Sequence, residues 1–206
     1  MLEASVADQI RAVVPPDWAL TVEIHCEDEA RFCLMTIQRR RSTACGVKPV
    51  GTCQQAYANS WCYSTVAPAS GDAFFLVLPK LNTANMQVFV DAFATTYPTT
   101  FNIILLDNSA VHTTQRLRLP ANVALVFLPP YSPELNSVER LWHDLRGRMA
   151  WRTFDDLDGL EAELCTQLRH YTPAVVQPLT SYPYLRRVIA EVGPWPQEAN
   201  LAECSR

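Results

Sequence analysis

Apolar residues recur along the chain with two periods, one typical of strands and the other typical of amphipathic helices. Alternation over residues 20–28 predicts a strand that ends at Asp28, with Ile24 and Asp28 on the same face. Glu27 falls on the opposite face, and Glu29 follows the strand. This parity indicates Asp28, rather than Glu27 or Glu29, as the acidic residue that points into the protein.

The other periodic segments predict a succession of strands and helices. Further strands are expected over residues 31–37, 55–66, 73–78, 102–107 and 123–128. Helices are expected over residues 6–14, 82–97 (with Thr83 as a cap), 136–149 and 157–171, and a short helix over 113–118 is compatible with the pattern. Residues 38–54 are polar and predict a long exposed connection, and the proline-rich tail after Pro173 is expected to pack across the domain. This order predicts an α/β domain in which helices flank a mixed sheet.

Three acidic residues stand at informative positions. Asp28 and Asp107 each close a predicted strand, and Glu139 lies in the helix that begins at Asn136. A carboxylate beside a buried strand is costly unless it is paired, and converging carboxylates raise one another's pKa values. Divalent ions remove that cost, and two ions about 4 Å apart can clamp the attacking and leaving oxygens of a phosphodiester. The pattern therefore indicates metal-dependent phosphoryl transfer on nucleic acid.

Each acidic residue also has an explanation without metal. Asp107 begins an Asp-Asn pair, a common turn signal, because both side chains bond to the nearby backbone. Asn136 and Glu139 have the spacing of a capping box, in which the Glu side chain bonds back to the start of its helix. Glu134 is a rival third acidic residue, although it lies before the helix, and the acidic run at 27–29 fits a solvated turn.

Three segments resemble the catalytic core of mariner-superfamily transposases, and in particular their bacterial branch, the insertion-sequence-630 family. They are residues 105–112, residues 128–136 with the sequence Leu-Pro-Pro-Tyr-Ser-Pro-Glu-Leu-Asn, and residues 139–142. Residues 27–32 resemble that family's first acidic motif. The resemblance covers residues 20–190 and implies a ribonuclease H-like catalytic domain there, with an N-terminal segment (1–19) before it and a tail (191–206) after it.

The resemblance implies the catalytic domain of a cut-and-paste DNA transposase. Asp28, Asp107 and Glu139 would bind two Mg²⁺ or Mn²⁺ ions, hydrolyse phosphodiesters at the ends of the element and transfer the freed strand into target DNA. Two alternatives stay open. One is an inactive or domesticated remnant that acts as a DNA-binding or interaction module, and the other is a ribonuclease H-like nuclease without strand transfer.

Other residues have supporting roles in this interpretation. Asn108 follows the second acidic residue, Asn136 begins the catalytic helix, and His112 could position a phosphate or the third carboxylate. His143 lies one turn after Glu139 and could donate a hydrogen bond to it. The predicted DNA-binding residues are Arg39, Arg40, Arg41, Tyr131 and Arg146.

Composition limits these interpretations. A net charge of -4 disfavours nonspecific DNA binding, so the local basic clusters would have to supply the phosphate contacts. The seven cysteines contain no C-x-x-C pair and are expected to be reduced and structural. The absence of a signal peptide or an apolar span predicts a cytoplasmic, nucleoid-associated protein. Because only about twenty residues precede the first strand, the element's ends are expected to be recognised by a separate helix-turn-helix polypeptide or domain, with a homodimer on DNA.

Overall fold

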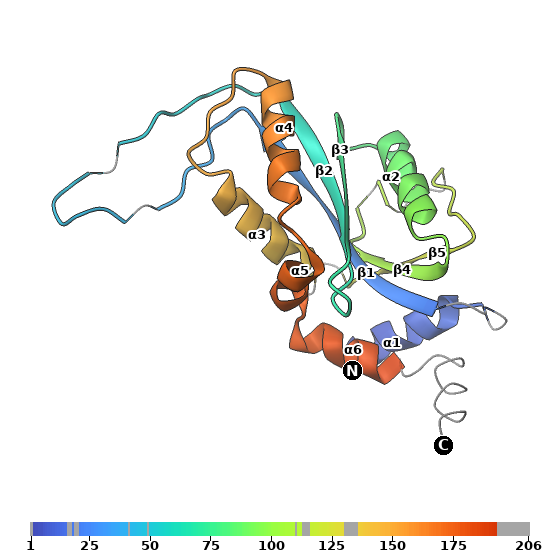
Figure 1. Ribbon diagram of the computed structural model, residues 1–206. Helices are drawn as coiled ribbons and strands as arrows, with labels where there is room; N and C mark the ends of the chain where they lie inside the picture. The colour runs from blue at the N-terminus through green and yellow to red at the C-terminus, as the bar shows by residue number, and fades with distance from the viewer. Residues whose placement is uncertain are drawn as a thin grey trace.

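The computed structural model describes residues 2–15, 18, 21–40, 42–48, 50–109, 111–112, 116–129 and 136–192 (Figure 1). Within these ranges, five strands form one mixed sheet in the order β3-β2-β1-β4-β5. The strands are β1 (Thr21–Cys33), β2 (Asn59–Val66), β3 (Ala73–Leu78), β4 (Thr100–Leu106) and β5 (Val123–Phe127). The helices are α1 (Leu2–Val13), α2 (Thr83–Thr96), α3 (Val138–Arg148), α4 (Leu157–Leu168), α5 (Pro173–Thr180) and α6 (Pro183–Val192).

The central strand β1 is longer than predicted because it has two partners in succession. Its first half pairs in parallel with β4 and its second half pairs antiparallel with β2, with Cys26 in both ladders. The acidic run at 27–29 continues the strand instead of ending it, since β2 satisfies its backbone groups. The separate strand predicted over residues 31–37 is therefore wrong, because β1 runs on to Cys33.

The end of β4 lies beside the acidic run of β1. Parallel pairing sets Cys26 opposite Leu105, and β4 ends one residue later at Leu106. Extending this register by two residues places Asp107 beside Asp28. The topology thus brings together two acidic residues that are far apart in the sequence, at the carboxyl end of a parallel strand where sites commonly form.

Different helices cover the two faces of the sheet (Figure 1). Helix α2 covers one face, where Phe89 and Phe93 share a core with Ile104 of β4. The other face carries a larger core, to which α1, α3, α4, α5 and α6 contribute. Side chains on both faces of β1 therefore lie in the protein interior. Among the described residues, no helix combines the length and the apolar composition that crossing a membrane requires.

Capping residues decide where several helices begin. Helix α2 is capped by Asn82 rather than by Thr83, because the Asn82 side chain accepts a hydrogen bond from the Asn85 N–H at 2.9 Å. The tail forms two helices that begin at Pro173 and Pro183, where a missing N–H is tolerated. The sequence predicted only that this proline-rich segment packs across the domain. Of the segment 113–118, residues 113–115 lie outside the described part, and the remainder is not helical.

A long arm connects β1 to β2 and projects from the body of the molecule (Figure 1). It spans residues 34–58, of which 41 and 49 lie outside the described part. Its base is joined to the connection between α3 and α4. The backbone N–H of Trp151 donates a hydrogen bond to the Ile37 carbonyl at 2.9 Å. The Gln54 side chain forms two hydrogen bonds with the Phe154 backbone, one as donor and one as acceptor. The predicted long connection is confirmed, and its base is held against the core domain.

Candidate active site

Asp28 lies on the sheet face that α3 covers, and Trp142 holds it there. The Trp142 indole Nε1 donates a hydrogen bond to Asp28 Oδ2 at 3.0 Å. The same indole is 1 % exposed and packs edge-on against Phe32, with ring centroids 6.3 Å apart. Burial, followed by the negative charges of Glu139 and Glu29, raises the pKa of Asp28 to about 7. The carboxylate is therefore fixed in position but short of positive charge.

Glu139 lies in the first turn of α3, where its side chain is exposed. Ser137, not Asn136, occupies the cap position, and it makes no side-chain capping bond. Asn136 instead joins the helix start to the sheet, because its Nδ2 donates to the Glu27 carbonyl at 2.6 Å and its Oδ1 accepts from the Val138 N–H at 3.1 Å. The Glu139 side chain forms no hydrogen bond with a described residue, so the capping-box explanation fails.

Asp107 follows the last residue of β4, and its local hydrogen bonds use one carboxylate oxygen. Oδ1 accepts from the Ser109 N–H and from His112 Nδ1, both at 2.9 Å. The side chain is 67 % exposed, and within the described part no hydrogen bond reaches Oδ2. Neighbouring Asn108 donates from Nδ2 to the Leu128 carbonyl at 2.8 Å, which ties the end of β4 to the segment after β5. The turn explanation and a ligand role are compatible, because they use different oxygens.

The three carboxylates suit a divalent cation. No Lys or Arg among the described residues forms an ion pair with Asp28, Asp107 or Glu139. The raised pKa of Asp28 reflects the cost of placing two anionic side chains together in a partly buried site. Oxygen ligands at an open site are those that Mg²⁺ and Mn²⁺ prefer. These residues therefore fit such ions, which would relieve the repulsion between the carboxylates.

The opposite face of β1 holds a second polar group, which we call the acid–histidine cluster: Glu27, Glu29 and His112. The His112 Nε2 lies 3.0 Å from Glu29 Oε1 and 3.5 Å from Glu27 Oε2. Glu27 is 1 % exposed and is more buried than Asp28, so the expectation of a single inward acidic residue is wrong. Alternation cannot distinguish the two faces here, since helices cover both of them.

The charges of this cluster influence one another. Burial lowers the pKa of His112, but the hydrogen bond and charge of Glu29 and the charge of Asp107 outweigh it, so the pKa is raised. Burial and the charges of Glu29, Asp28 and Asp107 raise the pKa of Glu27 well above its ordinary value. His112 is only 3 % exposed, so it does not have the position expected for a phosphate contact. It forms a hydrogen bond with Asp107 and not with Glu139, the third acidic residue.

The described basic residues expected to bind DNA gather near α3. Arg39, at the base of the arm, donates from Nη2 to the His143 carbonyl at 3.4 Å. Arg40 is exposed, and Arg146 is half-buried on α3 itself. A hollow of about 470 Å³ lies beside this contact and is lined by Arg39, His143, Asp144, Gly147 and Arg148. Positive side chains therefore border the helix that carries Glu139.

Other predicted residues have different positions or lie outside the described part. Arg41, Tyr131 and the rival acidic residue Glu134 lie outside the described residues. The ring of His143 is exposed and forms no hydrogen bond with Glu139 within the part of the chain that the structure describes. The suggested pairing of these two side chains along α3 is therefore not formed.

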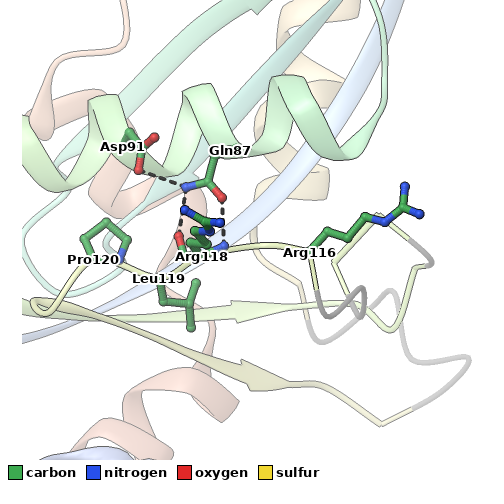
Figure 2. Close-up of a pocket in the computed structure, with 6 residues that line it drawn as sticks. All are labelled: Gln87, Asp91, Arg116, Arg118, Leu119 and Pro120. Carbon is green, nitrogen blue, oxygen red and sulfur yellow. Dashed lines mark hydrogen bonds between the residues drawn. The ribbon is translucent and has the colours of Figure 1, made fainter.

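A larger hollow, of about 630 Å³, lies between α2 and the segment before β5 (Figure 2). Gln87 bridges these elements, because its Nε2 donates to the Arg118 carbonyl and its Oε1 accepts from the Arg118 N–H, both at 2.8 Å. Figure 2 shows Arg116 extending away from this pair, while Asp91 accepts a second bond from Gln87. Among the described lining residues Asp91 is the one carboxylate, so this hollow offers no set of metal ligands.

Comparison with known proteins adds two findings from sequence. A family model described as DDE superfamily endonuclease matches residues 23–161, a range that includes Asp28, Asp107 and Glu139. The uncharacterized protein y4pE/y4sA of Sinorhizobium fredii is 35 % identical over 109 residues, which are 51 % of this chain and 81 % of that protein.

Solved structures of Mos1 transposase have a similar fold. A paired-end complex with the left transposon end matches with a TM-score of 0.60 and 15 % sequence identity. A mariner paired-end complex with Mn matches with a TM-score of 0.62 and 14 % sequence identity. Each match covers 94 % of this chain and 62 % of the Mos1 chain, so the chain spans less than two thirds of that protein. The likeness confirms the predicted α/β, ribonuclease H-like architecture.

Proposed function

Because the chain belongs to the DDE superfamily endonuclease family, we propose that it is the catalytic domain of a cut-and-paste DNA transposase. The observation that carries the proposal is the juxtaposition of Asp28 and Glu139 between β1 and α3, with Asp107 at the adjoining end of β4. These three residues are proposed to bind two Mg²⁺ or Mn²⁺ ions. Mos1 structures with Mn and with Mg support the use of such ions.

The carboxylates are held by groups that set their orientation before DNA binds. Trp142 fixes Asp28 through Oδ2, and His112 with a backbone N–H fixes Asp107 through Oδ1. Glu139 enters from the first turn of α3, where the positive helix N-terminus favours a phosphate. Bound divalent ions would activate water and offset the charge that develops on the phosphodiester. After hydrolysis, the same residues would orient the freed 3′-hydroxyl against target DNA, so no covalent enzyme intermediate is needed.

DNA is the proposed substrate, and the basic residues beside α3 are its proposed contacts. Arg39, Arg40 and Arg41 would bind backbone phosphates together with Arg146, and Tyr131 would contact DNA from the segment that precedes α3 in the sequence. Recognition of the element's ends is assigned to a helix-turn-helix region on another polypeptide or domain. The active unit is proposed to be a homodimer on DNA at the bacterial nucleoid. The structure of Mos1 as a paired-end complex with a transposon end supports the binding of element-end DNA.

Plasmid cleavage tests the proposal directly. The substrate is a supercoiled plasmid that carries the DNA flanking the gene for this chain, incubated with Mg²⁺ or Mn²⁺. We expect metal-dependent nicking by the parent, and a loss of at least about a hundredfold in Asp28→Asn, Asp107→Asn and Glu139→Gln. Asp155→Asn is the matched control, because Asp155 is an exposed carboxylate outside the site. Full cleavage by the three variants would contradict the assignment.

Joining of DNA ends separates the proposal from its alternatives. A transposase should insert a labelled end with a free 3′-hydroxyl into a second plasmid, whereas a nuclease without strand transfer should cleave and never join. A remnant that only binds DNA should do neither, although it would still retard a duplex in a gel. The intact set of three carboxylates favours the catalytic interpretation.

A further inference from the structure

Glu27 and Glu29 of the acid–histidine cluster have no part in the proposed reaction, in which His112 only orients Asp107, and the cluster lies inside the protein. Glu27, Glu29 and His112 each present one ligand atom, and these three atoms all lie within 4.8 Å of one another. The side chains of these residues are 0 %, 7 % and 2 % exposed. Polar side chains at this spacing, closed off from bulk water, must be compensated by one another, by protons or by a bound cation.

Glu27 is the member of the cluster whose charge is least compensated. Both of its carboxylate oxygens are buried, and neither accepts a hydrogen bond from a described residue. Among the described residues no Lys or Arg forms an ion pair with Glu27 or Glu29. A buried carboxylate without hydrogen bonds is strongly unfavourable unless it takes up a proton or a positive group neutralises it.

The orientation of His112 decides what that positive group can be. Its Nδ1 lies 2.9 Å from Asp107 Oδ1, and a carboxylate oxygen accepts, so Nδ1 carries a hydrogen and Nε2 faces the two glutamates. A hydrogen on Nε2 could reach Glu29 Oε1 at 3.0 Å, but Glu27 Oε2 at 3.5 Å lies beyond a good hydrogen bond. A cation between the three side chains would engage all of them, Glu27 included.

We propose that Glu27, Glu29 and His112 bind a first-row transition-metal ion, with Zn²⁺ the best match. Ligands about 2.1 Å from a metal ion lie roughly 3.0–3.4 Å apart. His112 Nε2 lies at similar distances, 3.0 Å and 3.5 Å, from Glu29 Oε1 and Glu27 Oε2. An imidazole with two carboxylates suits Zn²⁺ better than Mg²⁺, which prefers oxygen ligands. The bond from Nδ1 to Asp107 is the kind of contact that orients metal-bound histidines.

This ion would be distinct from those proposed for Asp28 and Glu139, because the cluster lies on the other face of β1. Through His112 it would also fix the orientation of Asp107. The inference rests on the geometry of the cluster and not on transposase activity. It would stand even if the chain proved unable to cleave DNA.

Zinc stoichiometry tests the inference. The full chain is stripped with EDTA, dialysed against Zn²⁺ at low micromolar concentration, and analysed for metal by plasma emission. The parent should retain one more Zn²⁺ per chain than Glu27→Gln, and the double variant Asp28→Asn/Glu139→Gln should keep that ion. X-ray absorption on this double variant should show one imidazole nitrogen and oxygen ligands at about 2.0–2.1 Å. Equal retention by Glu27→Gln and the parent, or loss of all Zn²⁺ from the double variant, would overturn the proposal.

Thermal melting separates lost binding from lost folding. In EDTA, Glu27→Gln should melt at or above the temperature of the parent, because the amide replaces a buried group that can ionise without changing the shape of the side chain. In the Asp28→Asn/Glu139→Gln background, added Zn²⁺ should raise the melting temperature, and the further change Glu27→Gln should abolish that rise. Glu29→Gln provides the same comparison if Glu27→Gln does not fold, and an equal Zn²⁺ response with and without Glu29→Gln in that background would contradict the site.

Discussion

The indole N–H of Trp142 donates a hydrogen bond to Asp28 Oδ2 at 3.0 Å and thereby joins the helix that carries Glu139 to the strand that carries Asp28. The same ring packs against Phe32 of β1. One side chain of the core therefore sets the separation of two carboxylates that repel each other. Preorganisation of this kind is what a site needs if its ligands are to stay in place without their ions.

Trp142→Phe removes the donor and keeps most of the aromatic packing. We expect the free energy of unfolding at pH 8 to fall by roughly 1–3 kcal/mol, since a hydrogen bond to a charged group is removed from a partly buried site. Urea denaturation measures the change. In an Asp28→Asn background the same substitution should cost less, because the amide accepts a weaker bond. An equal cost in both backgrounds would show that Trp142 stabilises the protein through packing alone.

The stability of the metal-free protein should fall as the pH rises. The pKa of Asp28 is raised to about 7 in the folded protein, against about 3.9 for an ordinary aspartate. Between these values the folded state binds more protons than the unfolded state, so the free energy of unfolding decreases with pH. The raised pKa of Glu27 acts in the same direction.

Urea titrations in EDTA at pH 5 and pH 7.5 measure this dependence. We expect Asp28→Asn to remove a decrease of roughly 2–3 kcal/mol between the two pH values, the difference between parent and variant being attributable to that residue. Asp155→Asn, which changes an exposed carboxylate, should leave the dependence as it is in the parent. A parent and an Asp28→Asn protein with parallel pH profiles would show that Asp28 titrates normally.

Local patterns predicted the parts of the fold that depend on local structure. The apolar run of β4 and the stripe of α3 are each visible in one segment, so the placement of Asp107 after a strand and of Glu139 on a helix could be predicted. The length of β1 could not be predicted from the sequence, because it depends on the pairing of β2 and β4 with different halves of this strand. An acidic run such as 27–29 suggests a turn until a neighbouring strand is known to satisfy its backbone.

The acid–histidine cluster needed tertiary information for the same reason. Glu27 and His112 are 85 positions apart, and only the parallel register of β1 and β4 brings them together. The one available signal was the predicted helix α2, whose apolar stripe implied that the second face of the sheet is also covered. On a sheet covered on both sides, every charged residue of the central strand needs a partner.

Glu139→Gln distinguishes a ligand from a capping residue. After burial, the Glu139 charge is the largest contribution to the raised pKa of Asp28, and the substitution removes it. The Glu139 side chain makes no capping bond to a described residue. We therefore expect the free energy of unfolding to stay unchanged or to rise by up to about 1 kcal/mol in EDTA. Asn136→Ala, which breaks the bonds to the Glu27 carbonyl and the Val138 N–H, should instead lower it by roughly 1–2 kcal/mol. Destabilisation of Glu139→Gln by a similar amount would restore the capping explanation.

Salt-dependent DNA binding tests the role of the arm. Arg39 and Arg40 lie at its base, and Arg39 bonds to the carbonyl of His143 on the helix that carries Glu139. A duplex that reaches the three carboxylates would pass these side chains. Because the chain carries a net charge of -4, we expect its binding to be weak and indifferent to sequence.

Replacing Arg39 and Arg40 with Ala should weaken binding to every duplex alike. It should also lower the slope of log affinity against log salt by about 2, because each of the two arginines would neutralise roughly one phosphate. The matched control replaces Arg169 and Arg186, which are exposed at the end of α4 and on α6 and carry the same total charge. If long-range charge alone attracts DNA, both double variants will bind DNA equally weakly. If the arm binds phosphates, only the replacement of Arg39 and Arg40 will change the slope.

A strong preference of the parent for element-end DNA over a scrambled duplex would show that this chain reads sequence itself, and no separate helix-turn-helix region would then be needed.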